Sequence, residues 1–342
     1  MGNCCTAGHQ NKDLNTNLNP PVEDDPELNK AALKIQAHFR GNQTRKQVHS
    51  GNPADLEDQI ATHGPPADLA QKITTIPDYS NANTTATHEK LGSFKFDRDD
   101  PGDSKLPTLP PFQFLENNAI YKGQWKDGMR HGRGEQFWTD GSRYIGYWRD
   151  NMASGKGRLI HADGDVYEGE WHEDKAHGKG IYIHMDGARY EGEWFEDKQH
   201  GRGVELWPDG ARYEGNYDMG KKQGQGSFKW ADGSTYVGEF QNNNIHGLGL
   251  YEWADGRKYN GEWRNNKMHG RGEFTWSDGR RYVGDYVDDK KQGQGDFEWP
   301  DGRKYKGSWD NGKQHGVGLY INAKGEEKRG EWADGKRLKW LQ

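Results

Sequence analysis

This 342-residue chain has few cysteines and no long run of apolar side chains. The two cysteines are adjacent, at positions 4 and 5, so no disulfide framework stabilises a fold. No stretch approaches the roughly 18 apolar residues of a membrane span, and the N-terminus lacks the apolar core of a secretory signal. We therefore expect a protein that is made and kept in the cytosol, where its thiols stay reduced unless they are modified.

An excess of basic residues is also missing. The chain has 47 Lys plus Arg against 53 Asp plus Glu, a net charge of -6, and residues 1–116 hold most of the imbalance. Neither part has the basic patch that binds nucleic acid, so we expect no nucleic-acid partner. Hydrophobic residues make up only 31% of the chain, and that average alone borders on the composition of a disordered protein.

Glycine and aromatic residues, by contrast, are abundant and recur at a fixed interval. All 14 tryptophans and 41 of the 48 glycines follow residue 112. In contrast, 11 of the 13 prolines precede it. A period of constant length predicts an array of stacked structural repeats. The tyrosines that mark the 23-residue period are Tyr121, Tyr144, Tyr167, Tyr190, Tyr213, Tyr236, Tyr259, Tyr282 and Tyr305.

Each repeat, numbered with its tyrosine as position 1, has the pattern of a β-hairpin. Positions 1, 3 and 5 hold Tyr, Gly and an aromatic residue, alternating with mostly polar residues, which predicts a strand with one aromatic face. A second strand is expected after the Gly-x-Gly at positions 12 to 14. Rings from neighbouring strands should fill the slot left by the glycine at position 3. The predicted aromatic core includes Tyr167, Trp171, Tyr190, Trp194, Tyr213, Trp230, Trp253, Tyr259, Trp263 and Trp276.

Two kinds of connection are expected between these strands. Asp-Gly at positions 20 and 21, as in Pro208-Asp209-Gly210, predicts a type I turn followed by a bulge, because glycine takes the positive φ that this turn needs. A longer loop is expected at positions 6 to 11. This loop mixes charges of both signs and lacks the clustered cations of an anionic-lipid site.

The pattern predicts an all-β fold: an elongated, single-layer antiparallel ribbon of β-hairpin repeats, roughly 90 Å long at about 4.8 Å between strands. Nine full repeats and terminal half units would occupy residues 112–342, with residues 110–118 capping the first strand edge. Ahead of the array we expect a disordered tail over residues 1–25, a helix over 26–48 and a mostly disordered linker over 49–111.

The motifs Tyr-x-Gly-x-Trp, His-Gly-x-Gly and Asp-Gly at this spacing resemble MORN (membrane occupation and recognition nexus) repeats over about residues 117–338. Proteins of this kind are scaffolds and adaptors at membranes, cilia and the cytoskeleton, and some carry an attached enzyme. The resemblance implies an adaptor without catalysis, and self-association of two copies at the C-terminal end. Departures are Ser154, Gln223 and Gln292 where His is usual, and Lys328 in place of Tyr.

The repeats argue against an active site, so we expect no enzyme, metal or cofactor. Histidines of neighbouring repeats would stand about 9 to 10 Å apart, whereas nitrogens on one zinc each lie about 2 Å from it. We expect each histidine to hydrogen-bond across its own hairpin loop. The Gly-x-Gly lacks the following Lys-Ser or Lys-Thr and the helix of a phosphate-binding loop. These histidines, at position 11, are His131, His177, His200, His246, His269 and His315.

The N-terminus predicts attachment to a membrane. The first six residues, MGNCCT, fit the N-myristoylation pattern M-G-x-x-x-[ST], with Gly2 as the acceptor. One myristoyl chain binds a membrane only marginally, so palmitoylation of Cys4, Cys5 or both would supply the second signal. The alternative is a coincidental Met-Gly start with idle thiols.

Residues 26–48 have the pattern of a basic amphipathic helix. They resemble an IQ motif, which in its family is bound by calmodulin or a related EF-hand protein, often without calcium. A merely solvated or membrane-surface helix is the alternative. The residues that the resemblance assigns to calmodulin binding are Ile35, Gln36, Phe39, Arg40, Gly41, Arg45 and Lys46.

These features favour a dual-acylated adaptor on the cytoplasmic face of the plasma membrane or an endomembrane. Lipid would attach the tail, an EF-hand protein would bind the helix, and a cytoskeletal or membrane-complex protein would bind the array. Two alternatives are a module whose array itself binds phosphoinositides, and a ciliary, axonemal or basal-body component in which the acylation motif is incidental.

Overall fold

The computed structural model describes residues 64–97 and 106–342. These residues form one helix and 22 strands, and every strand pairing is antiparallel, so the predicted all-β hairpin array is confirmed. Along the described part of the chain, no helix has the length and apolar character needed to cross a membrane. The chain divides into two units at residue 221, and each is described by itself.

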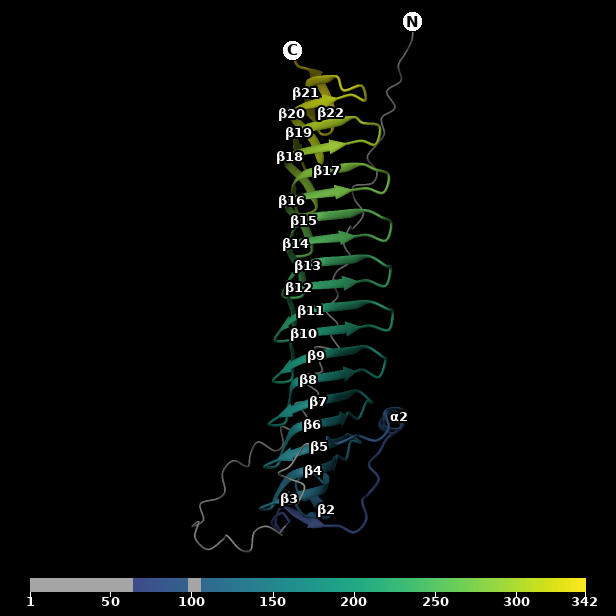
Figure 1. Ribbon diagram of the computed structural model, residues 1–342, viewed down its shortest axis with the longest axis vertical. Coiled ribbons are helices and arrows are strands. Elements are labelled where there is room, and N and C mark those ends of the chain that lie inside the picture. Colours follow the sequence, from purple (N-terminus) through teal and green to yellow (C-terminus); the bar gives the residue numbers. More distant parts are fainter. Residues whose placement is uncertain (1–63, 98–105) are drawn as a thin grey trace, which may run out of the picture. The chain divides into compact units, whose positions relative to one another are not determined.

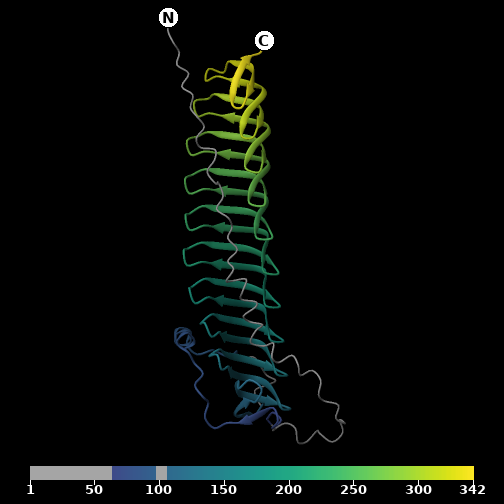
Figure 2. The ribbon, with the colours of Figure 1, turned by 180° about the vertical axis from the view of Figure 1, so that it is seen from behind.

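In each unit the strands follow one another in chain order (Figure 1), as the view from behind also shows (Figure 2). The first unit contains β1 (Ala70–Lys72), α2 (Ala82–Leu91), β2 (Thr108–Phe114), β3 (Ile120–Lys126), β4 (Met129–Phe137), β5 (Arg143–Arg149), β6 (Met152–Ile160), β7 (Val166–His172), β8 (Lys175–Ile183), β9 (Arg189–Phe195), β10 (Lys198–Leu206) and β11 (Arg212–Asp218). The second contains β12 (Lys221–Lys229), β13 (Thr235–Gln241), β14 (Asn244–Glu252), β15 (Lys258–Arg264), β16 (Lys267–Thr275), β17 (Arg281–Val287), β18 (Lys290–Glu298), β19 (Lys304–Asp310), β20 (Lys313–Ile321), β21 (Glu327–Ala333) and β22 (Lys336–Trp340).

The loop inside each hairpin is shorter than predicted. In the hairpin β5–β6 only Asp150 and Asn151 connect the strands, with φ of 49° and 70°. Positive φ at both residues is the type I′ turn that suits a two-residue hairpin. The expectation of a loop over positions 6 to 11 is therefore wrong, and the loop consists of positions 7 and 8.

The second strand of each repeat begins before the Gly-x-Gly, which corrects the predicted start. In β4 the first of these glycines, Gly132, has φ of 65° inside the strand. The register between β3 and β4 shifts between Gly123 and Trp125, which marks a β-bulge. The bulge breaks the period-two pattern, so the first half of the strand was not recognisable from alternation.

The Asp-Gly turn between repeats has the predicted geometry. At Asp140-Gly141 the glycine has φ of 95°, and its N–H donates to the Trp138 carbonyl at 3.0 Å. The Trp138 N–H donates to the Ser142 carbonyl at 3.0 Å, and the Asp140 carboxylate accepts from the Ser142 N–H at 2.8 Å. This type I turn with a following bulge is confirmed.

Residues 64–97, predicted as part of a disordered linker, instead pack on the array. Strand β2 pairs with β3 and covers the first strand edge, as predicted for residues 110–118, and β1 pairs in turn with the outer edge of β2. Helix α2 starts at a capping box formed by Asn81 and Thr84. It has no apolar stripe, and its two buried residues, Thr84 and Thr87, are polar. A search for hydrophobic period therefore missed it.

Candidate functional site

A tyrosine covers the paired glycines at the centre of each repeat. Tyr236 is fully buried, and its hydroxyl donates to the Glu239 carbonyl at 3.0 Å. An added Cβ at Gly249 would lie 2.3 Å from the Tyr236 hydroxyl oxygen, so no larger residue fits. The slot at the glycines is thus filled by the tyrosine of the same repeat, not by rings of neighbouring strands as predicted. The bond from position 1 to the carbonyl of position 4 recurs in all nine repeats.

Aromatic rings connect one repeat to the next. The Tyr167 ring meets Trp171 of its own repeat edge to face at 5.0 Å and Trp194 of the following repeat at 5.2 Å. The indole N–H of Trp194 donates to the Gly180 carbonyl of the preceding repeat at 3.2 Å. Of the predicted core residues, Trp230 and Trp276 are half-buried. The buried ones are Tyr167, Trp171, Tyr190, Trp194, Tyr213, Trp253, Tyr259 and Trp263.

Position 10 holds buried cations, and two of them, Arg130 and Lys291, lie against these rings. Arg130 lies 4.3 Å from the centre of the Trp148 ring. The Lys291 ammonium nitrogen lies 4.9 to 5.2 Å from the centres of four rings, those of Trp276, Tyr282, Phe297 and Trp309. Burial, and then the charge of Arg280, lower the pKa of Lys291 to about 7, while the ring faces favour the charged form and offset part of that cost.

A side-chain clasp that was not predicted from the sequence joins the loop to the repeat before it wherever position 8 is Asn or Asp, in six of the nine repeats. The Asn266 carboxamide accepts from the Ile245 N–H at 2.7 Å, while the Asn266 N–H donates to the Ile245 carbonyl at 2.9 Å. Asp174 makes the same pair of bonds with Ala153, and burial raises its pKa to about 6. Position 8 holds only Asp, Asn or Gly in every repeat, and this restriction was the available signal.

The position-11 side chains also reach the next repeat rather than their own loop, which corrects the sequence prediction. His131 Nδ1 accepts from the Asp150 N–H at 3.4 Å. Gln223, a departure from the usual His, accepts from the Asn242 N–H at 3.0 Å. Within residues 64–97 and 106–342, no group of three or more His, Cys, Asp or Glu side chains is arranged to hold a metal ion.

The second unit presents a row of rings along its Asp-Gly turns. Phe274 and Trp276 lie 4.4 Å apart, and Trp253 lies 5.3 Å from Phe274. The Arg280 guanidinium lies 5.2 Å from the Trp276 ring centre and donates to the Asp278 carboxylate at 2.7 Å. The same arrangement recurs in two neighbouring repeats, and we call the set the tryptophan–arginine edge: Trp253, Trp276, Trp299, Arg257, Arg280 and Arg303.

The tryptophan–arginine edge has the composition of a protein-binding surface. Trp276 and Trp299 are half-buried, so part of each ring reaches solvent. Tryptophan and arginine are enriched among the residues that carry binding energy at protein interfaces. Each arginine is held in place by an aspartate of its own turn, which reduces the entropy lost when a partner binds.

In the first unit, α2 occupies the corresponding turns. The Asn81 carboxamide donates to the Ala162 carbonyl at 2.9 Å, and the Thr87 hydroxyl donates to the Gly164 carbonyl at 3.1 Å. Figure 1 shows α2 beside β6 and β7, and α2 contacts β6. This part of the array is therefore covered by the chain itself.

A buried polar cluster that was not predicted from the sequence lies next to the turns that α2 covers. The Asp165 carboxylate accepts from the Tyr182 hydroxyl at 3.1 Å and lies 3.1 Å from His184 Nδ1. His161 and His184 stand at position 18, where most repeats have a tryptophan. That substitution was visible in the sequence. The cluster positions the Met185 backbone, whose N–H donates to Asp165 at 2.9 Å.

The predicted lipidation and calmodulin-binding residues fall outside the described part of the chain. They are Gly2, Cys4 and Cys5 for lipid, and Ile35, Gln36, Phe39, Arg40, Gly41, Arg45 and Lys46 for calmodulin.

Several solved structures resemble the chain at low identity. The TCP10 domain of Danio rerio CPAP, in complex with a peptide of Danio rerio STIL, is 13% identical over 62% of this chain and 94% of that chain, with a TM-score of 0.37. The SAS-4 TCP domain of Drosophila melanogaster, in complex with a proline-rich motif of Ana2, is 13% identical over 52% of this chain and 85% of that chain, with a TM-score of 0.26. Virginiamycin B lyase of Staphylococcus aureus is 10% identical over 64% and 82%, with a TM-score of 0.13.

Family comparisons match two parts of the sequence. Residues 29–49 match the IQ calmodulin-binding motif. The MORN repeat matches nine times and covers more than half of the chain, at 121–143, 144–166, 167–189, 190–212, 213–235, 236–256, 259–280, 282–302 and 305–327. Both are non-catalytic kinds of domain and fit a repeat scaffold. The chain therefore belongs to the MORN-repeat family and carries an IQ motif ahead of its repeats.

Proposed function

We propose that this protein is a membrane-anchored adaptor that brings an EF-hand protein and a second protein partner to a membrane or to the cytoskeleton beneath it. The tryptophan–arginine edge carries the proposal for the array. Each central tyrosine, its glycines and the position-8 side chains are used within or between repeats. The half-buried rings and guanidiniums of the edge are what the second unit offers to a protein partner.

The partner of residues 26–48 is calmodulin or a related EF-hand protein, as the IQ match supports. Replacing Ile35 by Glu places a charge on the face that an EF-hand lobe would bind, so binding should weaken at least tenfold. Titration of calmodulin with the full chain, with and without calcium, measures the effect. The matched control is Gln43→Glu, in the same segment but outside the assigned residues.

The membrane anchor is proposed from the MGNCCT start. Co-expression with an N-myristoyltransferase and a protein palmitoyltransferase gives a dual-acylated full chain for flotation with liposomes. The acylated chain should float, and the Gly2→Ala chain should stay in solution. If the Gly2→Ala chain floats equally well on liposomes that contain phosphoinositides, the array itself binds lipid and the anchor proposal fails.

From the same acylation motif we propose that the protein lies on the cytoplasmic face of the plasma membrane or an endomembrane. A Gly2→Ala chain that keeps its cellular position would instead favour the cilium or basal body.

We also propose that two copies associate through β22. Among the described strands, β22 pairs only with β21, and it exposes 62% of Leu338 and 38% of Trp340. An unpaired strand edge with exposed apolar side chains is a site for pairing with another chain. Light scattering should therefore give a dimer for the full chain and a monomer for Leu338→Lys/Trp340→Lys.

A further inference from the structure

Between α2 and Asp97 the chain crosses the first repeats as an extended segment. The Phe96 ring meets the Tyr147 ring edge to face at 5.3 Å. The Arg158 guanidinium donates to the Gly92 carbonyl at 2.7 Å, and the Tyr147 hydroxyl donates to the Asp97 carbonyl at 3.0 Å. The segment is thus held at both ends by side chains of the array, and we call residues 92–97 the crossing segment.

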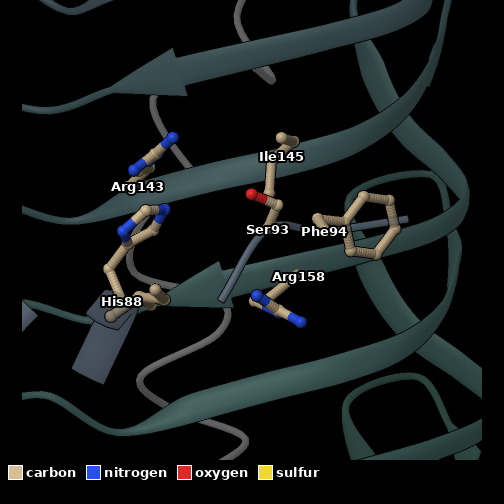
Figure 3. A pocket seen from close by; sticks show the side chains of 7 residues that line it. His88, Ser93, Phe94, Arg143, Ile145 and Arg158 are labelled. Atoms are coloured by element: carbon tan, nitrogen blue, oxygen red, sulfur yellow. The ribbon is translucent and has the colours of Figure 1, made fainter. Parts of the chain in front are cut away.

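A cavity of about 170 Å³ lies beneath the start of the crossing segment. His88, Ser93, Arg143 and Arg158 contribute the polar part of its lining. Figure 3 shows the Ser93 hydroxyl on the side that faces Arg143 and His88, with Arg158 on the opposite side of the serine. One water molecule occupies about 30 Å³ in the liquid, so the volume of the cavity is several times that of a single water molecule.

Each of the two guanidiniums that line the cavity has more N–H donors than its hydrogen bonds within the chain use. Arg158, with 8% of its side chain exposed, uses Nε on Glu168 at 2.6 Å and one Nη on the Gly92 carbonyl. Arg143 is paired with Glu135. Since a guanidinium has five N–H donors, both arginines retain donors for another anion. Burial, and then the charge of Arg143, hold the pKa of His88 below its usual value.

We propose that Ser93 is a phosphorylation site and that Arg143, on the side toward which the Ser93 hydroxyl points, binds the phosphoryl group. A protein kinase would transfer the terminal phosphoryl group of a nucleoside triphosphate to the Ser93 oxygen. One P–O bond forms to serine, the bond to the departing nucleoside diphosphate breaks, and the hydroxyl proton is released to solvent. Ser93 is exposed and follows Lys90 by three residues, so a kinase that selects a basic residue at that place can reach it.

The charges around the cavity decide whether the phosphoryl group is held or repelled. Glu135 and Glu168 each pair with one of the arginines, and Glu89 acts on His88 from α2 itself. A phosphoserine brings about 1.5 to 2 negative charges and three acceptor oxygens. Bonds from a guanidinium to a phosphoryl group are charge-assisted and shorter than ordinary hydrogen bonds. These bonds outweigh the repulsion by carboxylates that are already paired, so phosphorylation fastens the crossing segment to the array.

Hydrogen exchange on the full chain with phosphoserine incorporated at position 93 tests the proposal. Amides of residues 85–97 should exchange about tenfold more slowly than in the unmodified chain, because one or two charge-assisted bonds must break before the segment opens. Phosphoserine at position 277, an exposed turn in the other unit, is the control for added charge and should leave this exchange unchanged.

A second variant separates binding from folding. In Arg143→Gln with phosphoserine 93, most of the slowing should vanish, whereas Arg143→Lys should keep part of it, and circular dichroism shows whether either variant is folded. Phosphorus NMR should give the phosphoserine a pKa about one unit lower in the wild-type background than in Arg143→Gln. Faster exchange after phosphorylation would overturn the proposal. The proposal would also be overturned if 10 mM inorganic phosphate slowed amide exchange of residues 85–97 in the unmodified chain while phosphoserine at position 93 did not slow it.

Discussion

At the scale of single residues, the glycine at position 14 tolerates no side chain. An alanine Cβ at position 249 would lie 2.3 Å from the Tyr236 hydroxyl oxygen and 2.5 Å from two ring carbons. Since the ring is fully buried, it has no free space to move into. We expect Gly249→Ala to lower the free energy of unfolding by about 1–3 kcal/mol, as overpacking does. Urea unfolding followed by tryptophan fluorescence measures it.

Tyr236→Phe is the companion substitution to Gly249→Ala. It removes the bond to the Glu239 carbonyl and should cost about 1 kcal/mol. In the double variant the missing oxygen relieves part of the clash, so the two costs should sum to less than their separate values. An unchanged urea midpoint for Gly249→Ala would mean that the ring does not lie over this glycine.

Lys291 gives the second unit a pH dependence that can be measured. Below pH 7 the Lys291 ammonium group is protonated in both the folded and the unfolded chain. The burial of this charge then lowers the free energy of unfolding by its full amount. Between about pH 7 and 10.5 the unfolded chain keeps the proton that the folded chain releases, so stability rises with pH across that window. Above 10.5 the cost is gone. Relative to Lys291→Met, the wild-type chain should gain on the order of 5 kcal/mol between those limits, since one pKa unit corresponds to about 1.4 kcal/mol.

Urea midpoints at pH 6, 8 and 10 provide the comparison for Lys291. The variant should be the more stable protein at pH 6, and its advantage should shrink as the pH rises. Lys290→Met alters the neighbouring, exposed lysine and should show no such trend. A difference between wild type and Lys291→Met that is constant with pH would show that the ammonium group keeps its ordinary pKa.

At the scale of elements, the position-8 clasp determines how one hairpin is fixed to the previous one. Asn266 supplies both a side-chain acceptor to the Ile245 N–H and a backbone with φ of 65°. Asn266→Gly keeps the backbone but loses the side chain, so it should cost about 1 kcal/mol. Asn266→Ala loses both and should cost about 1 kcal/mol more, because alanine is strained at positive φ.

Hydrogen exchange at one amide and a comparison of the two variants check the clasp prediction for Asn266. Hydrogen exchange at the Ile245 amide should become faster in both variants, since its acceptor is removed. Asn265, the other loop residue, also has positive φ but is not part of this pair of bonds. If Asn266→Gly and Asn266→Ala are equally stable, the backbone conformation at this position contributes nothing.

The elements that the sequence predicted well are those with an uninterrupted pattern. Tyrosine, glycine and an aromatic residue alternate without a break in strands such as β15, and the Asp-Gly turn depends on local geometry alone. The predicted start of the second strand in each repeat was wrong because Gly132, and its equivalents, form a bulge inside that strand. Helix α2 was missed because polar contacts with turns more than 70 residues away hold it, and no local pattern reports such contacts.

The candidate surface was predictable in part. Aromatic residues at position 18 and arginines after Asp-Gly are visible in the sequence, but their stacking is not, since it depends on the register between strands. The same limit applies to Lys291, whose sequence context is that of any exposed lysine. Its burial results from four rings on three different strands and one turn, which only the folded array brings together.

At the scale of the molecule, repeats that contact only their neighbours should be removable in whole units. Deleting residues 259–281 takes out 23 residues and joins Lys258 to Tyr282. Tyr236, which now meets Trp263 at 5.8 Å, would then meet Tyr286 as Tyr259 does at 5.2 Å. Because stability in such arrays is approximately a sum of repeat and nearest-neighbour terms, the deletion should leave a folded chain with only a slightly lower urea midpoint.

Deleting residues 259–270 removes fewer residues but should do more damage. It joins Lys258 to Arg271 and puts position 13 where position 1 belongs, so the tyrosine of that repeat and its contacts on both sides are lost. The interruption separates the aromatic column of the second unit into two parts. We expect two unfolding transitions, or loss of the β-sheet spectrum beyond the deletion, in circular dichroism with urea. If the 23-residue deletion is the more damaging of the two, register between repeats does not determine the stability of the array.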